Sequence, residues 1–278
     1  MLRTGDWGGK PVTLEVYDSQ AWREFRGAPS YKGVNETTHL AKIADASGKL
    51  HSCYVKLIKP KTYGLLCEAI GWTLALHAQV PRVEFACVVM VPLRSLEKYL
   101  TLPSWLAGYE FYPAWCAEIV SGKSLAQVYS WGAASARTSC LKSVDTQKMA
   151  AFDFWADNVD RNFGNVIKSD VGRYVAIDHE TLLHEILWLP FGITYTPRRL
   201  WDNAQMLLPP NAKNDFRMNM LAAAATHHAA LAKAENEIKS VIQKLLGVKA
   251  GSPTEQQVYN FLLGRSDTSW LPSQLVAA

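Results

Sequence analysis

The stretch "DNVDRNFGNVIKSDVGRYVAIDHE", residues 157–180, gathers carboxylates and asparagines between segments that are strongly apolar. Asn165 follows Asp160 by five positions, and Asp178 follows Asn165 by thirteen. The sequence between them predicts a strand, a turn at "SDVG" and a second strand that ends on Asp178. Two such strands can hold a carboxamide and a carboxylate side by side, as a hard divalent cation requires. The stretch therefore predicts a metal site with Asn165 and Asp178 as ligands and Asp160 beside the metal.

This order of residues is that of phosphate-transfer enzymes. In kinases an Asp takes the proton of the acceptor hydroxyl, an Asn five residues later binds magnesium, and a second Asp joins magnesium to the phosphates. Kinases also hold the α- and β-phosphates with a Lys on a strand, which pairs with a Glu on a helix. Lys56 in the strand pattern "CYVKLI" and Glu68 in the next helix pattern match this pair. We therefore expect Asp160 to be catalytic, and Lys56 and Glu68 to bind ATP.

Two further segments concern the nucleotide. The segment "RGAPSYKGVNETTHL" carries Gly27 and Gly33 between predicted strands, where backbone N–H groups can cover phosphates. The segment "CAEIVSGKSL" lies where a strand-rich half of the chain meets a helix-rich half. We expect the backbone from Glu118 to Val120 to hold the adenine there, which makes Glu118 and Val120 cofactor-binding residues.

The rest of the chain predicts an α+β fold. Alternating patterns predict strands, and helical spacing with Gly, Pro and Ser at the ends predicts helices. Strands are expected at 12–18, 38–58 (a hairpin), 83–92 and 114–122, and helices at 64–79, 124–132, 146–158, 214–247 (one or two) and 252–264, with a loosely packed tail after Arg265. These elements predict a two-lobed, protein-kinase-like fold. A small antiparallel-sheet N-lobe with one helix would span residues 1–118, and a larger, mostly helical C-lobe residues 119–278.

Composition excludes several other classes of protein. The 278 residues carry a net charge of +4 without a cluster of Lys and Arg, so direct binding to nucleic acid is not expected. Five scattered cysteines without a C-x-x-C pair indicate reduced thiols rather than disulfides or structural zinc. The N-terminus lacks a secretory pattern, and no apolar run reaches the about 18 residues of a membrane span. We expect a soluble, cytoplasmic protein without a membrane partner.

Other interpretations of the polar stretch were weighed against the kinase site. Asp and Asn also populate ordinary turns. The segment "HETLLHE" resembles a zinc-protease helix, but His179 and His184 are five apart and would lie roughly 140° apart around a helix. We expect Asp157 and Arg161 to pair with each other or to cap the preceding helix, and the tryptophans to fill the core. The role of Glu180 stays open.

"DRNFGN" followed by "YVAIDHE", and preceded by "YVKLI" and an acidic helix, resembles the HipA-like kinases and is more distantly similar to the D-R-H-x-x-N pattern of phosphoinositide kinases. The resemblance covers roughly residues 25–185. It implies a two-lobed kinase fold, ATP with magnesium, and transfer to a protein Ser or Thr. In that family the substrates include translation factors, and a helix-turn-helix antitoxin is a partner. The resemblance thus agrees with the roles assigned to Asp160, Asn165, Asp178 and Lys56.

The chain departs from that family at two points. Asn162 stands where related motifs often carry His, so Asp160 must act without it. The N-terminal extension of full-length HipA toxins is also expected to be missing, which weakens the expectation of a toxin. The sequence leaves three functions open: a HipA-like Ser/Thr kinase as the leading hypothesis, a small-molecule or lipid kinase on the same scaffold, and a non-catalytic nucleotide-binding regulatory module.

Overall fold

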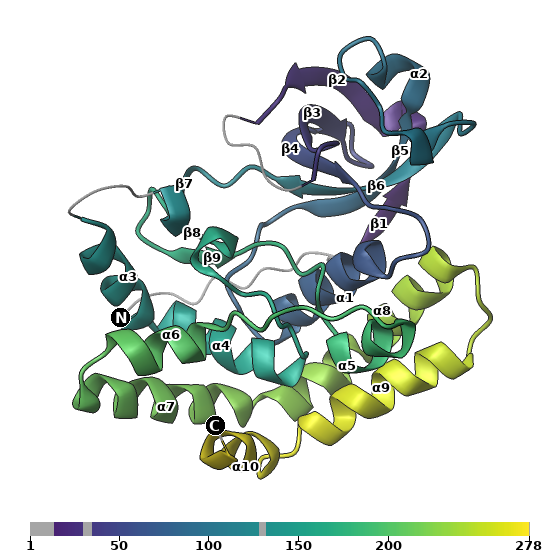
Figure 1. The fold of residues 1–278 in the computed structure, drawn as a ribbon. Coiled ribbons are helices and arrows are strands. Elements are labelled where there is room, and N and C mark those ends of the chain that lie inside the picture. Colours follow the sequence, from purple (N-terminus) through teal and green to yellow (C-terminus); the bar gives the residue numbers. More distant parts are fainter. Residues whose placement is uncertain (1–13, 30–34, 128–131, 278) are drawn as a thin grey trace.

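The computed structural model describes residues 14–29, 35–127 and 132–277. It is a mixed α+β structure with a six-stranded sheet, a three-stranded sheet and many helices (Figure 1). Short 3-10 turns join several of these elements, at Ser19–Ala21, Ser104–Leu106, Leu125–Gln127, Phe163–Asn165 and Leu189–Phe191. In the part of the chain that the structure describes, no helix combines the length and apolar character needed to span a membrane.

The six-stranded sheet has the strand order β1-β5-β6-β4-β3-β2. The neighbouring strands pair antiparallel except β1, which runs parallel to β5. The expected, mostly antiparallel sheet is thus present, and β1 is its exception, because pairing direction depends on how the chain crosses over and not on the pattern within a strand. The strands are β1 (Glu15–Tyr17), β2 (Trp22–Gly27), β3 (His39–Ala44), β4 (Leu50–Leu57), β5 (Ala86–Pro92) and β6 (Phe111–Glu118).

Strand β4 gives the sheet two different faces. Cys53, Val55 and Leu57 alternate along it and are fully buried in a core with the neighbouring strands. Side chains of successive strand residues point to opposite faces, so Lys56 leaves the sheet on the other side. The expected hairpin of β3 and β4 is confirmed, with its turn closed by Gly48 N–H donating to Asp45 O at 2.9 Å.

Helix α1 (Gly64–His77) lies between the six-stranded sheet and the C-terminal helices (Figure 1) and confirms the helix expected at 64–79. It is buried along most of its length and packs against α8 (His227–Leu246). The larger hydrophobic core therefore joins α1 and part of β5 to the helices of the second half. The division at residue 118 stays a prediction, because this core crosses it.

The second half is mainly helical. Its helices are α3 (Ala133–Leu141), α4 (Val144–Trp155), α5 (His184–Leu187), α6 (Leu200–Leu207), α7 (Pro210–Ala224), α8, α9 (Pro253–Arg265) and α10 (Trp270–Ala277), and the short α2 (Leu93–Leu96) belongs to the first half. The helix expected at 124–132 is wrong for its described residues 124–127, because Ser124 pairs with the second sheet. The expected loose tail is also wrong, since Leu271 and Leu275 of α10 are buried one helical turn apart.

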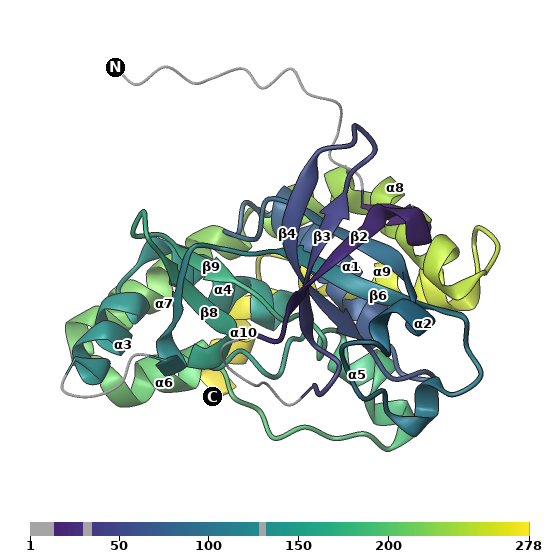
Figure 2. The same cartoon turned by 90° about the horizontal axis from the view of Figure 1, so that it is seen from above.

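The second sheet has the order β7-β8-β9 and consists of β7 (Gly122–Ser124), β8 (Val166–Ser169) and β9 (Tyr174–Ala176). The hairpin expected across "SDVG" is confirmed as β8 and β9. Seen from above, it lies beside the six-stranded sheet and not within it (Figure 2). The chain leaves β9 toward α1, and Asp178 follows the strand by two residues.

Residue types expected in the core are found there. The five cysteines are free and buried, which fits the expectation of unpaired thiols. Most of the tryptophans singled out in the sequence are also buried, namely Trp72, Trp115, Trp155, Trp188 and Trp201.

Candidate functional site

The side chain of Lys56 is the centre of a cluster of three carboxylates. Its Nζ lies 3.4 Å from Glu68 Oε1, 3.1 Å from Asp178 Oδ1 and 2.5 Å from Glu180 Oε2. These residues come from β4, from α1 and from the segment after β9. The structure thus brings together Lys56, Glu68 and Asp178 as expected from the sequence, and it adds Glu180, whose role the sequence left open. We call these four residues the Lys56 cluster.

Electrostatics in the Lys56 cluster favour the charged lysine. Burial opposes the charge of Lys56, but attraction to Asp178, Glu68 and Glu180 outweighs it, so the pKa of Lys56 lies well above its ordinary value. Burial raises the pKa of Glu68 and of Glu180, although Lys56 acts in the opposite direction. Burial also opposes ionisation of Asp178. The attraction and the hydrogen bond of Lys56 act against burial, and the pKa of Asp178 is lowered. One cation therefore faces more negative charge than it balances.

Helix α1 approaches the segment after β9 closely enough that only glycine fits. A Cβ on Gly71 would lie 2.5 Å from His179 Cβ, and a Cβ on Gly64 would lie 2.7 Å from Glu180 Cγ. Positions 64, 68 and 71 share one face of the helix, so Glu68 lies between the two glycines. Its Oε2 accepts a hydrogen bond from the backbone N–H of His179 at 2.9 Å. Glu68 is therefore fixed at both carboxylate oxygens.

Asp160 lies in the loop before β8 with both side-chain oxygens engaged. Oδ1 accepts from Asn162 Nδ2 at 2.8 Å, and Oδ2 accepts from Arg198 Nη2 at 2.6 Å. Asn165 Nδ2 donates to the backbone carbonyl of Asp160 at 2.8 Å. This bond uses the amide nitrogen within the loop, so Oδ1 is the atom that Asn165 can offer to a metal.

Arg161 joins this loop to the hairpin of β8 and β9. Its guanidinium is fully buried and pairs with Asp153 of α4, with Nε at 3.2 Å from Oδ2. Nη1 donates to the backbone carbonyls of Asn165, Ile177 and Asp178. We call Arg161 and Asp153 the Arg161 pair. The side chain of Arg161 therefore connects the loop that carries Asp160 to the segment that carries Asp178.

The expected pairing of Arg161 with Asp157 is wrong. Asp157 lies 3.3 Å from Arg265 Nη1 and accepts the backbone N–H of Glu185 at 2.7 Å. The two residues are four apart, but the chain between them is not helical, so the spacing does not bring their side chains together.

The segment expected to hold adenine is the exit from β6. The backbone N–H of Glu118 donates to Phe85 O, and that of Ile119 donates to Ser52 O, both at 2.9 Å. The side chain of Glu118 turns to His51, with Oε1 at 3.0 Å from Nδ1. Val120 is half-buried and packs against the larger core. The N–H groups of Glu118 and Ile119 and the carboxylate of Glu118 are thus engaged within the protein, and adenine binding at Glu118 and Val120 stays a prediction.

The two glycines of the expected phosphate loop are described only in part. Gly27 ends β2 with a φ of +123°, a conformation that favours glycine. Gly33 lies outside the described residues. The described chain resumes at Asn35, whose Nδ2 donates to Leu57 O at 3.0 Å.

Magnesium fits the donors that the structure brings together. Mg²⁺ takes oxygen ligands, keeps several waters and needs one or two carboxylates with substrate phosphates, so it does not require a cage of protein ligands. Asp178 offers a carboxylate whose side chain is 40% exposed, and Asn165 offers Oδ1. Within the described residues, no group of three His, Cys, Asp or Glu side chains forms a metal cage. The donor set therefore suits magnesium better than a tightly chelated metal.

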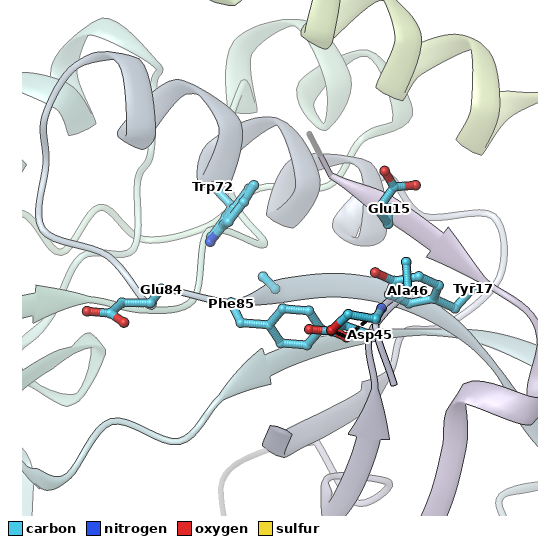
Figure 3. A pocket seen from close by; sticks show the side chains of 9 residues that line it. Glu15, Tyr17, Asp45, Ala46, Trp72, Glu84 and Phe85 are labelled. Atoms are coloured by element: carbon cyan, nitrogen blue, oxygen red, sulfur yellow. Dashed lines mark hydrogen bonds between the residues drawn. The ribbon is translucent and has the colours of Figure 1, made fainter. Parts of the chain in front are cut away.

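Two hollows lie away from these residues. One, of about 300 Å³, is lined by Glu15, Tyr17, Asp45 and Phe85 of the six-stranded sheet and its turns, and by Trp72 of α1 (Figure 3). The other is formed around the loop that joins α1 to β5 and includes Arg173. Neither is lined by Lys56, Asp160 or Asp178.

Two side chains at the candidate site could not be predicted from the sequence, and the role of a third stayed open there. Glu180 follows Asp178 by two positions, and this spacing was the one signal that could have placed it beside Lys56. Asp153, on the helix before the loop, and Arg198, 38 positions after Asp160, gave no local signal. Comparison with known proteins adds no assignment, since no protein-family model matches the chain and no curated protein does either.

Proposed function

We propose that this protein is an ATP- and magnesium-dependent kinase with a two-lobed, protein-kinase-like arrangement, which phosphorylates a Ser or Thr of another protein. The observation that carries the proposal is the contact of Lys56 with Glu68 from a helix and Asp178 from a hairpin, next to a loop with Asp160 and Asn165. These residue types at these places are those that phosphoryl transfer uses. The HipA-like resemblance supports the same reaction.

In this proposal each side chain has one task. Lys56 binds the α- and β-phosphates of ATP, and Glu68 holds Lys56 in place from α1. Asn165 and Asp178 would hold magnesium, which neutralises charge on the phosphates. Asp160 accepts the proton of the acceptor hydroxyl. Asn162 orients the carboxylate of Asp160 through the hydrogen bond to its Oδ1. Asn162 thus takes over a positioning role at the place where related motifs often carry His.

The acceptor and the partners follow from the resemblance alone. A translation component is the proposed protein substrate, a helix-turn-helix antitoxin is the proposed partner, and the proposed location is the cytoplasm. A small-molecule or lipid kinase would use the same side chains with another acceptor, because a fold does not fix the substrate. A regulatory module would bind ATP without transferring phosphate.

Incubation with labelled ATP and magnesium separates these functions. Label in protein supports the proposal, label in a lipid or metabolite supports the second function, and ATP binding without any transfer supports the third. We expect Asp160→Asn to lower transfer by about 100-fold or more, in the range for loss of a general base, and Asp178→Asn to lower it similarly. Asp170→Asn is the matched control, because Asp170 lies in the turn of the same hairpin and bonds to Ser121. Wild-type rates in both site variants would show that the site is wrong.

Nucleotide binding gives a second test, which does not depend on the acceptor. We expect Lys56→Met to weaken binding of ATP with magnesium, because the ammonium that meets the phosphates is gone, while the fold is kept. Calorimetric titration measures the affinity, and circular dichroism checks the fold. Lys42→Met is a suitable control, since Lys42 lies on the adjacent strand β3 and bonds to Ser52. Unchanged affinity in Lys56→Met would remove Lys56 from the nucleotide site.

A further inference from the structure

Arg198 is held against Asp160 by its backbone as well as by its side chain. Its backbone N–H donates to Val159 O at 2.8 Å, and residues 160 and 198 form a parallel β-bridge. Its Nη2 lies 2.6 Å from Asp160 Oδ2. The guanidinium is nevertheless 60% exposed, whereas the side chain of Asp160 is 20% exposed. Arg198 therefore presents a positive charge to solvent at the outer oxygen of Asp160.

The loop from Asp160 to Asn165 contains no exposed cation that could contact a phosphoryl group. Arg161 is its one basic residue, and that side chain is fully buried against Asp153 and backbone carbonyls. Asn162 is uncharged, and Lys56 is engaged by three carboxylates. A phosphoryl group passing between ATP and an acceptor carries negative charge on three oxygens. Among the described residues, Arg198 is the cation that contacts Asp160 and so is in place to meet it.

The chemistry of arginine suits this task. The guanidinium has five N–H donors in a planar fork, and the bond to Asp160 uses Nη2. The exposed donors that remain match phosphate oxygens. An ordinary exposed ion pair contributes little and needs no fixed backbone, whereas Arg198 is anchored through its own main chain. Its position is therefore set by the fold and not only by a flexible side chain.

We propose that Arg198 is a further catalytic residue, which binds the phosphoryl group during transfer and holds Asp160 toward the acceptor hydroxyl. This inference rests on the proposed kinase function. In the step, the bond from the γ-phosphorus to the oxygen of ADP breaks and its electron pair stays with ADP. The acceptor oxygen forms the new bond to phosphorus, and its proton passes to Asp160.

The test compares Arg198→Met and Arg198→Lys with the wild type. Arginines that act in cis or in trans on such transfers contribute about 10³ to 10⁵ in rate, so we expect kcat to fall by at least about 100-fold in Arg198→Met and by less in Arg198→Lys. The KM for ATP should change by less than about threefold, because the ground-state phosphates are bound by Lys56. Arg173→Met is a matched control, since Arg173 is also 60% exposed and lies 2.8 Å from Asp145.

A binding experiment separates this inference from the proposed function. Aluminium fluoride with ADP and magnesium mimics the phosphoryl group in transfer, so wild-type protein should bind this mixture more tightly than ADP with magnesium alone. Arg198→Met should lose that difference and keep the affinity for ADP, whether or not an acceptor is known.

Equal or faster turnover in Arg198→Met would overturn the inference, since Arg198 would then only hold Asp160 in an unproductive position. An unchanged aluminium fluoride effect in that variant, or none in wild type, would also overturn it. Wild-type protein that binds no nucleotide would overturn both the inference and the proposed function.

Discussion

The Lys56 cluster and the Arg161 pair are two ionic groups in the same part of the molecule, the first partly exposed and the second buried, and they differ in how their charges balance. In the Lys56 cluster, one ammonium faces three carboxylates. In the Arg161 pair, one guanidinium faces one carboxylate and donates to three backbone carbonyls. Asn158 Nδ2 also donates to Asp153. The protein therefore completes the second group with its own atoms and leaves the first with surplus negative charge.

This difference separates scaffold from candidate site. A buried ion pair is tolerated when its remaining donors and acceptors are satisfied, and Arg161 and Asp153 meet this condition. Perturbed carboxyl groups around one cation are typical of functional sites, where a bound ligand or metal completes the charge. Under the proposed function, magnesium would offset the charge of the Lys56 cluster, while the Arg161 pair holds the segments that carry Asp160 and Asp178.

The largest expected effect comes from breaking the Arg161 pair. Arg161→Met leaves the carboxylate of Asp153 buried without its cation, and it should lower the free energy of unfolding by about 3–5 kcal/mol. Denaturant unfolding measures this loss. The double variant Arg161→Met with Asp153→Leu should recover much of the stability, because the unpaired charge is removed as well.

The double variant also shows what the Arg161 pair does for the site. It removes the donor to the carbonyls of Asn165 and Asp178, so we expect it to fold but to bind ATP with magnesium more weakly than wild type. Full stability together with full nucleotide affinity would show that the pair does not position the site.

A middle-sized loss of stability is expected at acid pH, and His227 in the helical core should contribute to it. Burial lowers the pKa of His227 to about 3, and its ring stacks on Trp155 at 4.4 Å. The unfolded chain binds this proton below about pH 6.5 while the folded protein does not, so stability falls as the pH drops through that range. The slope is about 1.4 kcal/mol per pH unit, or about 2 kcal/mol between pH 6.5 and pH 5.

Unfolding by urea at a series of pH values measures that slope. His227→Phe keeps an aromatic ring on Trp155 without a titrating group, so its slope should be smaller than that of wild type. His228→Gln is the control, because His228 is exposed beside it and should leave the slope unchanged. A wild-type slope in His227→Phe would place the acid sensitivity elsewhere, with His179 as the next candidate, because burial lowers its pKa to about 3 as well.

The smallest expected effect is the most direct test of surplus charge. The pKa of Glu180 is raised in the folded protein, so its ionisation at neutral pH opposes folding. Glu180→Gln should therefore raise the free energy of unfolding of the ligand-free protein, by less than either change above. Thermal and denaturant unfolding at pH 7 measure the change. A loss of stability instead would mean that the bond from Lys56 to Glu180 completes the cluster, as Asp153 completes Arg161.

Local patterns predicted the parts of the site that local structure determines. Alternation along β4 placed Lys56 on the face opposite Val55 and Leu57, helical spacing predicted α1, and the turn residues predicted the hairpin of β8 and β9. The contact of Lys56 with Glu68 follows from these elements, because the strand and the helix are close in sequence. The contact of Lys56 with Asp178 could be predicted only because their order in the chain matches that of kinases, since 122 positions separate the two residues.

Other parts of the site depend on packing that local patterns do not record. Arg161 pairs with Asp153 and not with Asp157 because the chain turns after α4. Arg198 reaches Asp160 through a bridge between distant segments, and α10 covers the helices through two leucines in a sequence without strong periodicity. The same holds for β1, whose parallel pairing with β5 is a property of chain topology.

The two glycines of α1 have a mechanical consequence. Because Gly64 and Gly71 let the helix backbone touch His179 and Glu180 directly, any slide or rotation of α1 would collide with that segment. The backbone N–H of His179 also donates to Glu68 of this helix, so we expect helix and segment to move together. If nucleotide entry requires the protein to open, the six-stranded sheet has to swing relative to α1. Lys56 would then move with the sheet, while Glu68 and Asp178 stay fixed to each other.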